Sequence, residues 1–265
     1  MQAMNSKPPA NPDPATALVP HRPLSSYYAD EPARQQFVRR IFDETAPDYD
    51  RIEHILAFGT GPGYRRQALA RAGLSSGARM LDVGIGTGLV AREALALIGS
   101  SGRLIGVDPS PGMLDQVKLP GVTLMQGRAE AIPQPDASAD FLSMGYALRH
   151  IGDFHAAAAE FHRVLKPGAR LVILEITKPR GRIGTLLLKA YMRGVVPLLA
   201  RMVSRQADTA RLWRYYWDTI EACIAPSQVM AALRAAGFND VAHHVELGIF
   251  SEYTATRPGT APTSA

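Results

Sequence analysis

The stretch MLDVGIGTG at residues 80–88 joins an apolar run to three alternating glycines. This pattern is typical of a buried β-strand that turns sharply into a helix, and residues 89–98 after it have helical composition. Glycine accepts a positive φ and lacks the Cβ that would block a ligand. The helix N-terminus then offers free N–H groups and the positive end of its dipole to a polar or anionic group. The loop is therefore a candidate ligand site, although a tight turn that binds nothing shares the same pattern.

Strands and helices alternate on both sides of this loop. Apolar runs predict five strands, at residues 79–83, 103–107, 122–125, 140–144 and 170–176, with helical patterns between them. Such alternation predicts an α/β fold with a doubly wound parallel sheet. Two closing strands, at 241–247 and 249–256, form a hairpin-like pair at the sheet edge. The expected sheet is thus seven-stranded and mostly parallel.

The composition predicts a single domain between two tails. Residues 1–32 are rich in Pro, Ala, Asn and Ser and are predicted to be a disordered tail. Residues 33–257 form the single domain, and residues 258–265 form a polar tail. Helical patterns at 33–73, broken at Pro47, precede the first strand and are expected to cap a site formed by the strands.

A helical insert at residues 183–224 follows the fifth strand. It is rich in Leu, Val, Met, Tyr and Trp, and basic residues lie among the leucines. An apolar face with basic flanks suits a lid over a hydrophobic molecule, or contact with a membrane surface. The same residues could equally be ordinary core.

Charge and cysteine content exclude several classes of function. The formal net charge is +5 without a lysine-rich block, so we expect no nucleic-acid partner. The only cysteine, Cys223, excludes a disulfide framework and a cysteine-based metal centre, and we expect no metal. A reducing, cytoplasmic setting follows, with peripheral membrane contact and a homodimer left open.

The spacing of the glycines narrows the classes of ligand that the loop is expected to bind. The dinucleotide fingerprint requires a third glycine where this chain has Leu89, so a pyrophosphate is disfavoured. Asp108 ends the second predicted strand, about 20 residues further on, where a carboxylate accepts ribose hydroxyls. A nucleoside-like ligand with little phosphate is therefore expected, and a nicotinamide oxidoreductase is disfavoured.

These features resemble class I S-adenosylmethionine-dependent methyltransferases, and more narrowly the ubiquinone/menaquinone biosynthesis C-methyltransferases. The resemblance runs from about Val38 to Tyr253. The glycine loop, Asp108, GRAEAIP at 127–133 and LKPG at 165–168 carry the resemblance to the broad class. The pieces specific to the narrower family are FD at 42–43 with Ala46, YD at 49–50, LAFG at 56–59, YALRH at 146–150 and LEITKP at 174–179.

The resemblance implies S-adenosylmethionine as cofactor and assigns its contacts. The glycine loop would wrap the amino-acid part, with a carboxylate beneath it, Asp108 would hold the ribose, and further residues would border the adenine and the floor. The residues so implied are Gly84, Gly86, Thr87, Gly88 and Asp82 for the loop, Arg128 and Ala129 for the adenine, and Gly145 for the floor.

Three residues are expected to be catalytic, Tyr49 and Arg149 from the resemblance and His150 from its own chemistry. Tyr49 would close over the methyl-donor end, and Arg149 would lie beside the acceptor ring. An arginine stays protonated, so it would stabilise a phenolate or position a water rather than act as a base. His150 stands where the family usually has Asn, and could move a proton or simply hydrogen-bond.

The acceptor expected from the resemblance is a small hydrophobic aromatic molecule, with a lipophilic quinol methylated on carbon as the leading hypothesis. Departures from the family pattern at Glu53, Leu89, Arg128 and Gly145 leave a different ring open. Two alternatives remain: O- or N-methylation of another hydrophobic metabolite, and a non-catalytic cofactor-binding component of a quinone-synthesis complex.

Overall fold

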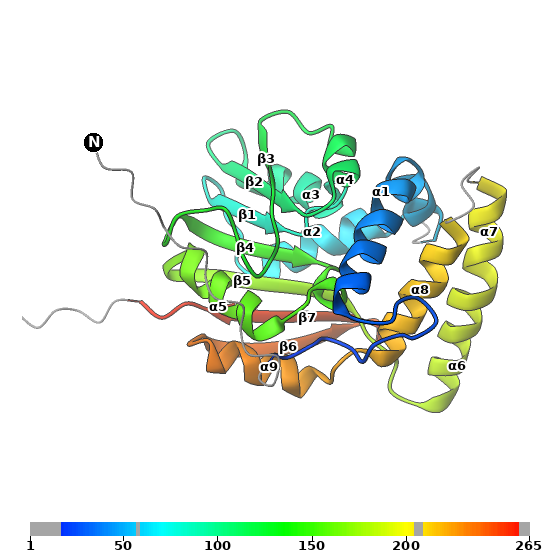
Figure 1. Cartoon of the computed structure of the whole chain (residues 1–265). Helices are drawn as coiled ribbons and strands as arrows, with labels where there is room; N and C mark the ends of the chain where they lie inside the picture. Colours follow the sequence, from blue (N-terminus) through cyan, green and yellow to red (C-terminus); the bar gives the residue numbers. More distant parts are fainter. Residues whose placement is uncertain (1–16, 57–58, 204–208, 260–265) are drawn as a thin grey trace, which may run out of the picture.

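The computed structural model describes residues 17–56, 59–203 and 209–259, so half of the LAFG motif lies outside the described residues. Within these ranges, seven strands form one sheet in the order β3-β2-β1-β4-β5-β7-β6 (Figure 1). The strands are β1 (Arg79–Val83), β2 (Arg103–Asp108), β3 (Val122–Gln126), β4 (Ala139–Gly145), β5 (Leu165–Ile176), β6 (Asn239–Glu246) and β7 (Phe250–Thr256).

The sheet confirms the predicted α/β architecture. The first five strands pair with one another in parallel only, and β7 runs antiparallel to both β5 and β6. The strand order reverses at β1, which lies between β2 and β4, and ligands bind beyond the carboxyl ends of strands at such a point. Most boundaries differ from the prediction by one or two residues, and the largest difference is that β5 begins at Leu165 rather than Arg170, because Leu165 pairs with Ala139 before an irregularity in the ladder.

Helices cover both faces of the sheet. On one face α5 (Phe154–Val164) and α9 (Pro226–Ala235) bury Phe161 and Leu233 against the strands. On the other face α2 (Gly61–Arg71) and α3 (Leu89–Ile98) bury Leu69 and Ala94. The short helix α4 (Pro111–Gln116) follows β2. Since α2 packs in this second layer, it is not part of a cap, contrary to the prediction for 33–73.

A third cluster lies beyond the carboxyl ends of the strands, at the right of Figure 1. It contains α1 (Glu31–Leu56), α6 (Arg182–Ala190), the π-helical turn η2 (Tyr191–Val195), α7 (Val196–Val203) and α8 (Thr209–Ala222). The predicted break at Pro47 is wrong, because α1 is one helix through that residue. Buried Ile41 and Ile52 on either side of Pro47 anchor both halves, so tertiary packing outweighs the lost backbone hydrogen bond.

The predicted tail is shorter than 1–32. Residues 17–32 pack against the domain: the Leu18 amide donates to Asp153, and the Ile224 amide donates to the Pro20 carbonyl. His21 and Tyr28 are buried. The proline content suggested disorder, but these backbone groups find partners 135 or more residues away, which no local pattern reveals. Residues 1–16 lie outside the described part of the chain.

Candidate active site

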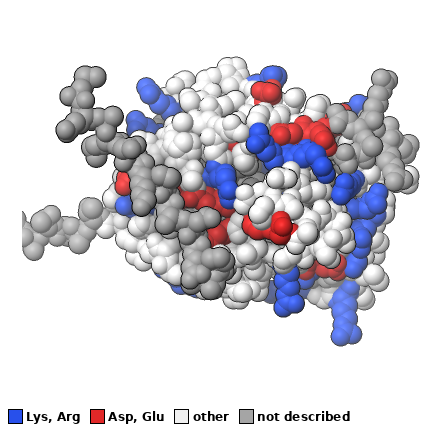
Figure 2. Space-filling view, viewed as in Figure 1, with Lys and Arg blue, Asp and Glu red and all other residues white. Residues whose placement is uncertain are grey.

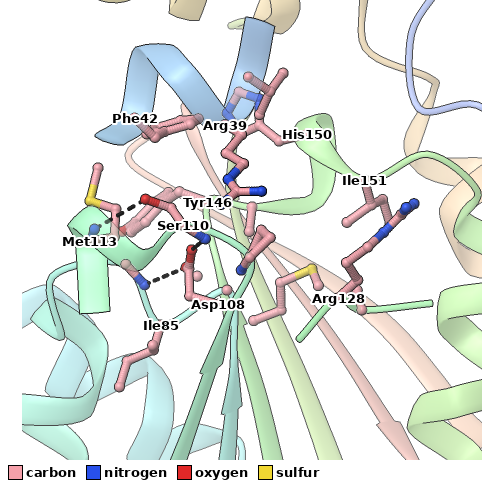
Figure 3. A pocket seen from close by; sticks show the side chains of 18 of the residues that line it. Arg39, Phe42, Ile85, Asp108, Ser110, Met113, Arg128, Tyr146, His150 and Ile151 are labelled. Atoms are coloured by element: carbon pink, nitrogen blue, oxygen red, sulfur yellow. Dashed lines mark hydrogen bonds between the residues drawn. The ribbon is translucent and has the colours of Figure 1, made fainter. Parts of the chain in front are cut away.

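A cavity of about 590 Å³ opens at the carboxyl edge of the sheet, between the loop after β1 and helix α1 (Figure 3). Its volume lies within the range of roughly 300–1,000 Å³ that is usual for small-molecule sites. Figure 3 shows Asp108 at the floor, with Phe42 on the α1 side. The strand ends and α1 therefore enclose one site.

The glycine loop approaches the cavity with its backbone. Gly84, Gly86 and Gly88 all have positive φ, at 70°, 56° and 90°. A Cβ on Gly84 would lie 2.6 Å from the Ala147 side chain, so glycine is required there by packing. A Cβ on Gly86 would meet nothing within 4 Å, because this residue faces the cavity. Gly86 thus leaves open a space that a ligand can occupy.

The Asp108 carboxylate hydrogen-bonds the backbone of the glycine loop and of the turn after β2. Its Oδ2 accepts the Gly86 amide at 2.8 Å, and its Oδ1 accepts the Ser110 amide at 2.9 Å. Burial raises the pKa of this carboxyl to about 6, against the opposing effect of the two amides. A carboxylate offers about four lone-pair positions, so both oxygens retain room for ligand hydroxyls.

The other predicted cofactor residues divide into two groups. Thr87, Arg128, Ala129 and Gly145 are close to the cavity and line it, whereas Asp82 and Gly88 do not. Asp82 is fully buried in β1, where Oδ1 accepts the Ser143 hydroxyl and burial raises its pKa to about 7. Asp82 therefore links β1 to β4 ahead of the loop, and Gly88 forms the left-handed N-cap of α3.

Two carboxylates of α1 fasten this helix over the loop. Asp43 accepts the Ser110 hydroxyl at 2.6 Å and the Gly112 amide at 2.9 Å. Asp50 accepts the Thr87 hydroxyl. Sequence reasoning quoted both aspartates within motifs but assigned them no role; their spacing of seven residues, two turns along one helix face, was the available signal.

The wall opposite Asp108 is aromatic. Tyr49 lines the cavity and its hydroxyl hydrogen-bonds the Tyr216 hydroxyl at 2.6 Å, while its ring stacks on Trp213 at a centroid distance of 6.0 Å. Phe42 packs on both tyrosines. Burial raises the pKa of Tyr216 to about 12, so both hydroxyls stay protonated at neutral pH. A flat aromatic acceptor could stack here.

Arg149 does not line the cavity in this structure, so its predicted contact with the acceptor ring stays a prediction. It is fully buried in the 3₁₀ turn η1 (Leu148–His150), and its Nε donates to Glu175 at 2.9 Å. Its Nη1 donates to the Tyr216 carbonyl and to Thr219, and its guanidinium lies 4.9 Å from the Tyr216 ring centre. The arginine therefore holds Tyr216 from behind.

His150 does line the cavity, between Phe42 and Tyr215. Burial and the charge of Arg149 hold its pKa well below the usual value, so the imidazole is neutral at pH 7. Its Nδ1 lies 3.5 Å from the Tyr215 hydroxyl, and its Nε2 is buried without a hydrogen-bond partner among the described residues. A neutral imidazole with a vacant nitrogen can accept a proton or a hydrogen bond.

Comparison with known proteins shows which family this chain belongs to. The model of the ubiE/COQ5 methyltransferase family matches residues 30–257. The chain belongs to this family. It is 33% identical over 226 residues to the ubiquinone/menaquinone biosynthesis C-methyltransferase UbiE of Geobacter sulfurreducens, covering 82% of this chain and 87% of that one. It is 32% identical to a demethylmenaquinone methyltransferase of Deinococcus radiodurans, covering 83% and 92%.

Solved structures show the same fold. A SAM-dependent methyltransferase from Thermotoga maritima aligns with a TM-score of 0.58 at 22% identity, covering 83% of this chain and 99% of that one. A phosphoethanolamine N-methyltransferase from Haemonchus contortus, solved in complex with S-adenosyl-L-methionine, aligns with a TM-score of 0.60 at 18% identity, covering 85% and 60%. The family match and the curated relatives identify the chain as a SAM-dependent methyltransferase, as the sequence predicts, and the solved structures show the same fold.

The sequence analysis did not identify the residues that form and position the aromatic wall of the cavity. Glu175 was quoted only as part of a motif, and Tyr216 only as one of several aromatic residues in the insert. The aromatic run at 213–217 was the available signal, since an exposed helix rarely needs four large rings in five residues. Of the departures from the family pattern, Glu53 forms an ion pair with buried Arg65, and Leu89 lines the cavity.

Proposed function

We propose that this methyltransferase transfers the methyl group of S-adenosylmethionine to a ring carbon of a lipophilic quinol or a related aromatic molecule. One observation carries the proposal: the cavity has a polar floor built on Gly86 and Asp108, and an aromatic wall built on Phe42, Tyr49 and Tyr216. A polar nucleoside matches the floor, and an aromatic ring matches the wall. The relatives named as quinone-biosynthesis methyltransferases support the same choice.

The residues present fit the cofactor. Asp108 would accept the ribose hydroxyls, and the open space at Gly86 would admit the amino-acid part to the loop backbone. Arg128, Ala129 and Gly145 border the same cavity and would surround the adenine and the floor. When bound, the cofactor supplies an electrophilic methyl group on a sulfonium.

The protein's own contribution is positioning and the handling of a proton. Tyr49 and Tyr216, tied to each other and backed by Trp213 and Arg149, would hold the ring in line with the methyl group and exclude water. Ring methylation on carbon is easier when a hydroxyl of the ring is deprotonated. His150 borders the cavity as a neutral imidazole, so we assign it the passage of that proton to water; its lowered pKa means that it would not keep the proton. After the transfer, the hydrogen of the methylated ring carbon leaves as a proton and the ring hydroxyl is restored, so one proton is released for each methyl group transferred.

The glycine loop allows a matched test of the cofactor site. We expect Gly86→Ala to weaken S-adenosylhomocysteine binding about tenfold or more, because the new methyl group enters the ligand space. Gly121→Ala is the control: its φ of 80° is also positive and its Cβ would also meet nothing within 4 Å, but it does not line the cavity. Both variants should lose about 1–2 kcal/mol of stability from left-handed strain.

Calorimetric titration measures the affinities, and thermal unfolding measures the stabilities. Equal affinities for the two variants would show that Gly86 does not border the cofactor.

Labelled methyl transfer tests the acceptor class. We expect the protein, incubated with methyl-labelled S-adenosylmethionine and a lipid extract, to label a hydrophobic quinol, and His150→Ala to reduce that labelling far more than it reduces cofactor affinity. Mass spectrometry of the labelled fraction identifies the product. Labelling only of water-soluble amines or of protein would contradict the proposed acceptor while leaving cofactor binding intact.

A further inference from the structure

The outer face of α6 and α7 is apolar and exposed. Leu186 and Leu187 of α6 lie three and four residues after Ile183, and Leu198 of α7 lies three residues after Val195, so the side chains within each set share a helix face. Their exposed fractions are high for such residues: Ile183 77%, Leu186 66%, Leu187 66%, Val195 45% and Leu198 61%. Contiguous exposed apolar patches mark binding surfaces more often than chance exposure does.

The opposite face of the same helical segment is already used. Met192 and Val196 are buried, and Leu188 packs beside them in the cluster that contains Trp213 and Tyr216 of α8. The segment is therefore apolar on both faces, and only the inner face packs against the rest of the domain. A helix needs one apolar face to pack on a domain, so the outer leucines require a second explanation.

The charge of this segment is of one sign. Residues 176–207 contain seven Lys and Arg and no Asp or Glu. Lys189 and Arg193 pair with carboxylates of α8, whereas Arg180 and Arg182 are exposed and form no ion pair within the described ranges. Figure 2 shows Lys and Arg side chains along the right-hand side of the view, where α6 and α7 lie in Figure 1.

We propose that this face, Ile183, Leu186, Leu187, Val195 and Leu198 with Arg180 and Arg182, binds the surface of an anionic phospholipid membrane. Leucines at the level of the acyl chains and arginines at the level of the headgroups are the pattern of an interfacial helix. No helix in the described residues is long and apolar enough to cross a membrane, so the segment lies on the surface.

A second copy of the chain is the less favourable occupant. A twofold interface would bring the same patch of both copies together, and with it the same unpaired arginines. Like charges facing each other oppose association, whereas anionic headgroups neutralise them.

The position of the face relative to the cavity deepens the proposed function, although membrane binding does not depend on it. Helix α8 lies between the two: Tyr216 borders the cavity, and the same helix packs on η2 and α7. A membrane-dissolved acceptor would thus be one helix layer away from the cavity.

Vesicle sedimentation tests the proposal with the full-length protein. Wild type should sediment with vesicles of phosphatidylcholine containing phosphatidylglycerol, and bind vesicles of phosphatidylcholine alone more weakly. Leu186→Ser combined with Leu187→Ser should lose binding about tenfold or more to both. Arg180→Gln combined with Arg182→Gln should lose about tenfold to thirtyfold on the anionic vesicles only, from roughly 1 kcal/mol per arginine.

The matched controls lie at the far side of the sheet. Leu124→Thr on the edge strand β3 removes an apolar side chain that is 36% exposed, and Arg103→Gln removes an exposed arginine at the start of β2; neither should change vesicle binding. Unchanged S-adenosylhomocysteine affinity confirms that each variant is folded.

Three results would overturn the proposal. The first is a wild-type protein that stays in the supernatant with the anionic vesicles, and the second is equal binding by the face variants and the controls. The third is sedimentation velocity showing a dimer that the leucine variants convert to a monomer, with no vesicle binding, because that would make the face an interface between copies. None of these results bears on methyl transfer in detergent solution, so this proposal and the proposed function fail separately.

Discussion

Asp108→Ala is expected to weaken S-adenosylhomocysteine binding about a hundredfold. The carboxylate would accept both ribose hydroxyls, and each charge-assisted hydrogen bond is worth roughly 1.5–3 kcal/mol, so about 3 kcal/mol is a conservative loss for the pair. The substitution also removes the acceptor of the Gly86 and Ser110 amides, which loosens the loop itself. Isothermal titration calorimetry measures the effect directly.

Two further variants, one conservative and one a control at another site, are needed to interpret the loss of affinity. Asp108→Asn keeps the shape and one acceptor oxygen, and should retain more affinity than Asp108→Ala. Asp136→Ala removes a carboxylate that is 78% exposed and pairs only with Arg163 among the described residues, so it should leave the affinity unchanged. Unaltered binding in Asp108→Ala would show that the ribose lies elsewhere.

Arg149→Ala is expected to cost about 3–5 kcal/mol of the free energy of unfolding. The substitution leaves the Glu175 carboxylate buried without its cation, which is among the most destabilising single changes in a protein interior. It also removes the hydrogen bonds to the Tyr216 carbonyl and to Thr219. Urea denaturation followed by circular dichroism measures the loss.

The double variant Arg149→Met with Glu175→Leu distinguishes a structural role of Arg149 from a role in methyl transfer. Removing both charges should recover most of the lost stability, since a buried ion pair is often no better than an apolar pair of similar volume. If instead Arg149→Ala stayed within about 1 kcal/mol of wild type but abolished methyl transfer, the arginine would contact the acceptor, as the family resemblance implied, and the structural role assigned here would be wrong.

The sheet could be predicted because its signals are local. The strand runs and the glycine turn after β1 each depend on a few neighbouring residues, and the structure confirms them. The continuous helix through Pro47 and the packed segment 17–32 could not be predicted, because distant burial stabilises both. Pattern and propensity describe local preferences, and tertiary packing overrides them.

The same distinction applies to the site. The floor could be predicted because the glycine loop and Asp108 lie at the ends of adjacent parallel strands, β1 and β2. The environment of Arg149 could not, because Glu175 and Tyr216 lie 26 and 67 residues away in sequence. An arginine after a central strand is compatible with catalysis and with a buried ion pair, and only the position of its carboxylate distinguishes them.

The position of the transferred methyl group tests the central claim most directly. We would incubate the protein with S-adenosylmethionine carrying a ¹³C-methyl group and a reduced lipophilic quinol that has an unsubstituted ring carbon, and analyse the product by NMR. The account predicts a ¹³C signal of a methyl group on an aromatic carbon, strongly reduced at low cofactor concentration when Asp108→Ala replaces the wild type. A methoxy or N-methyl signal, or no transfer by a protein that binds S-adenosylhomocysteine, would contradict it.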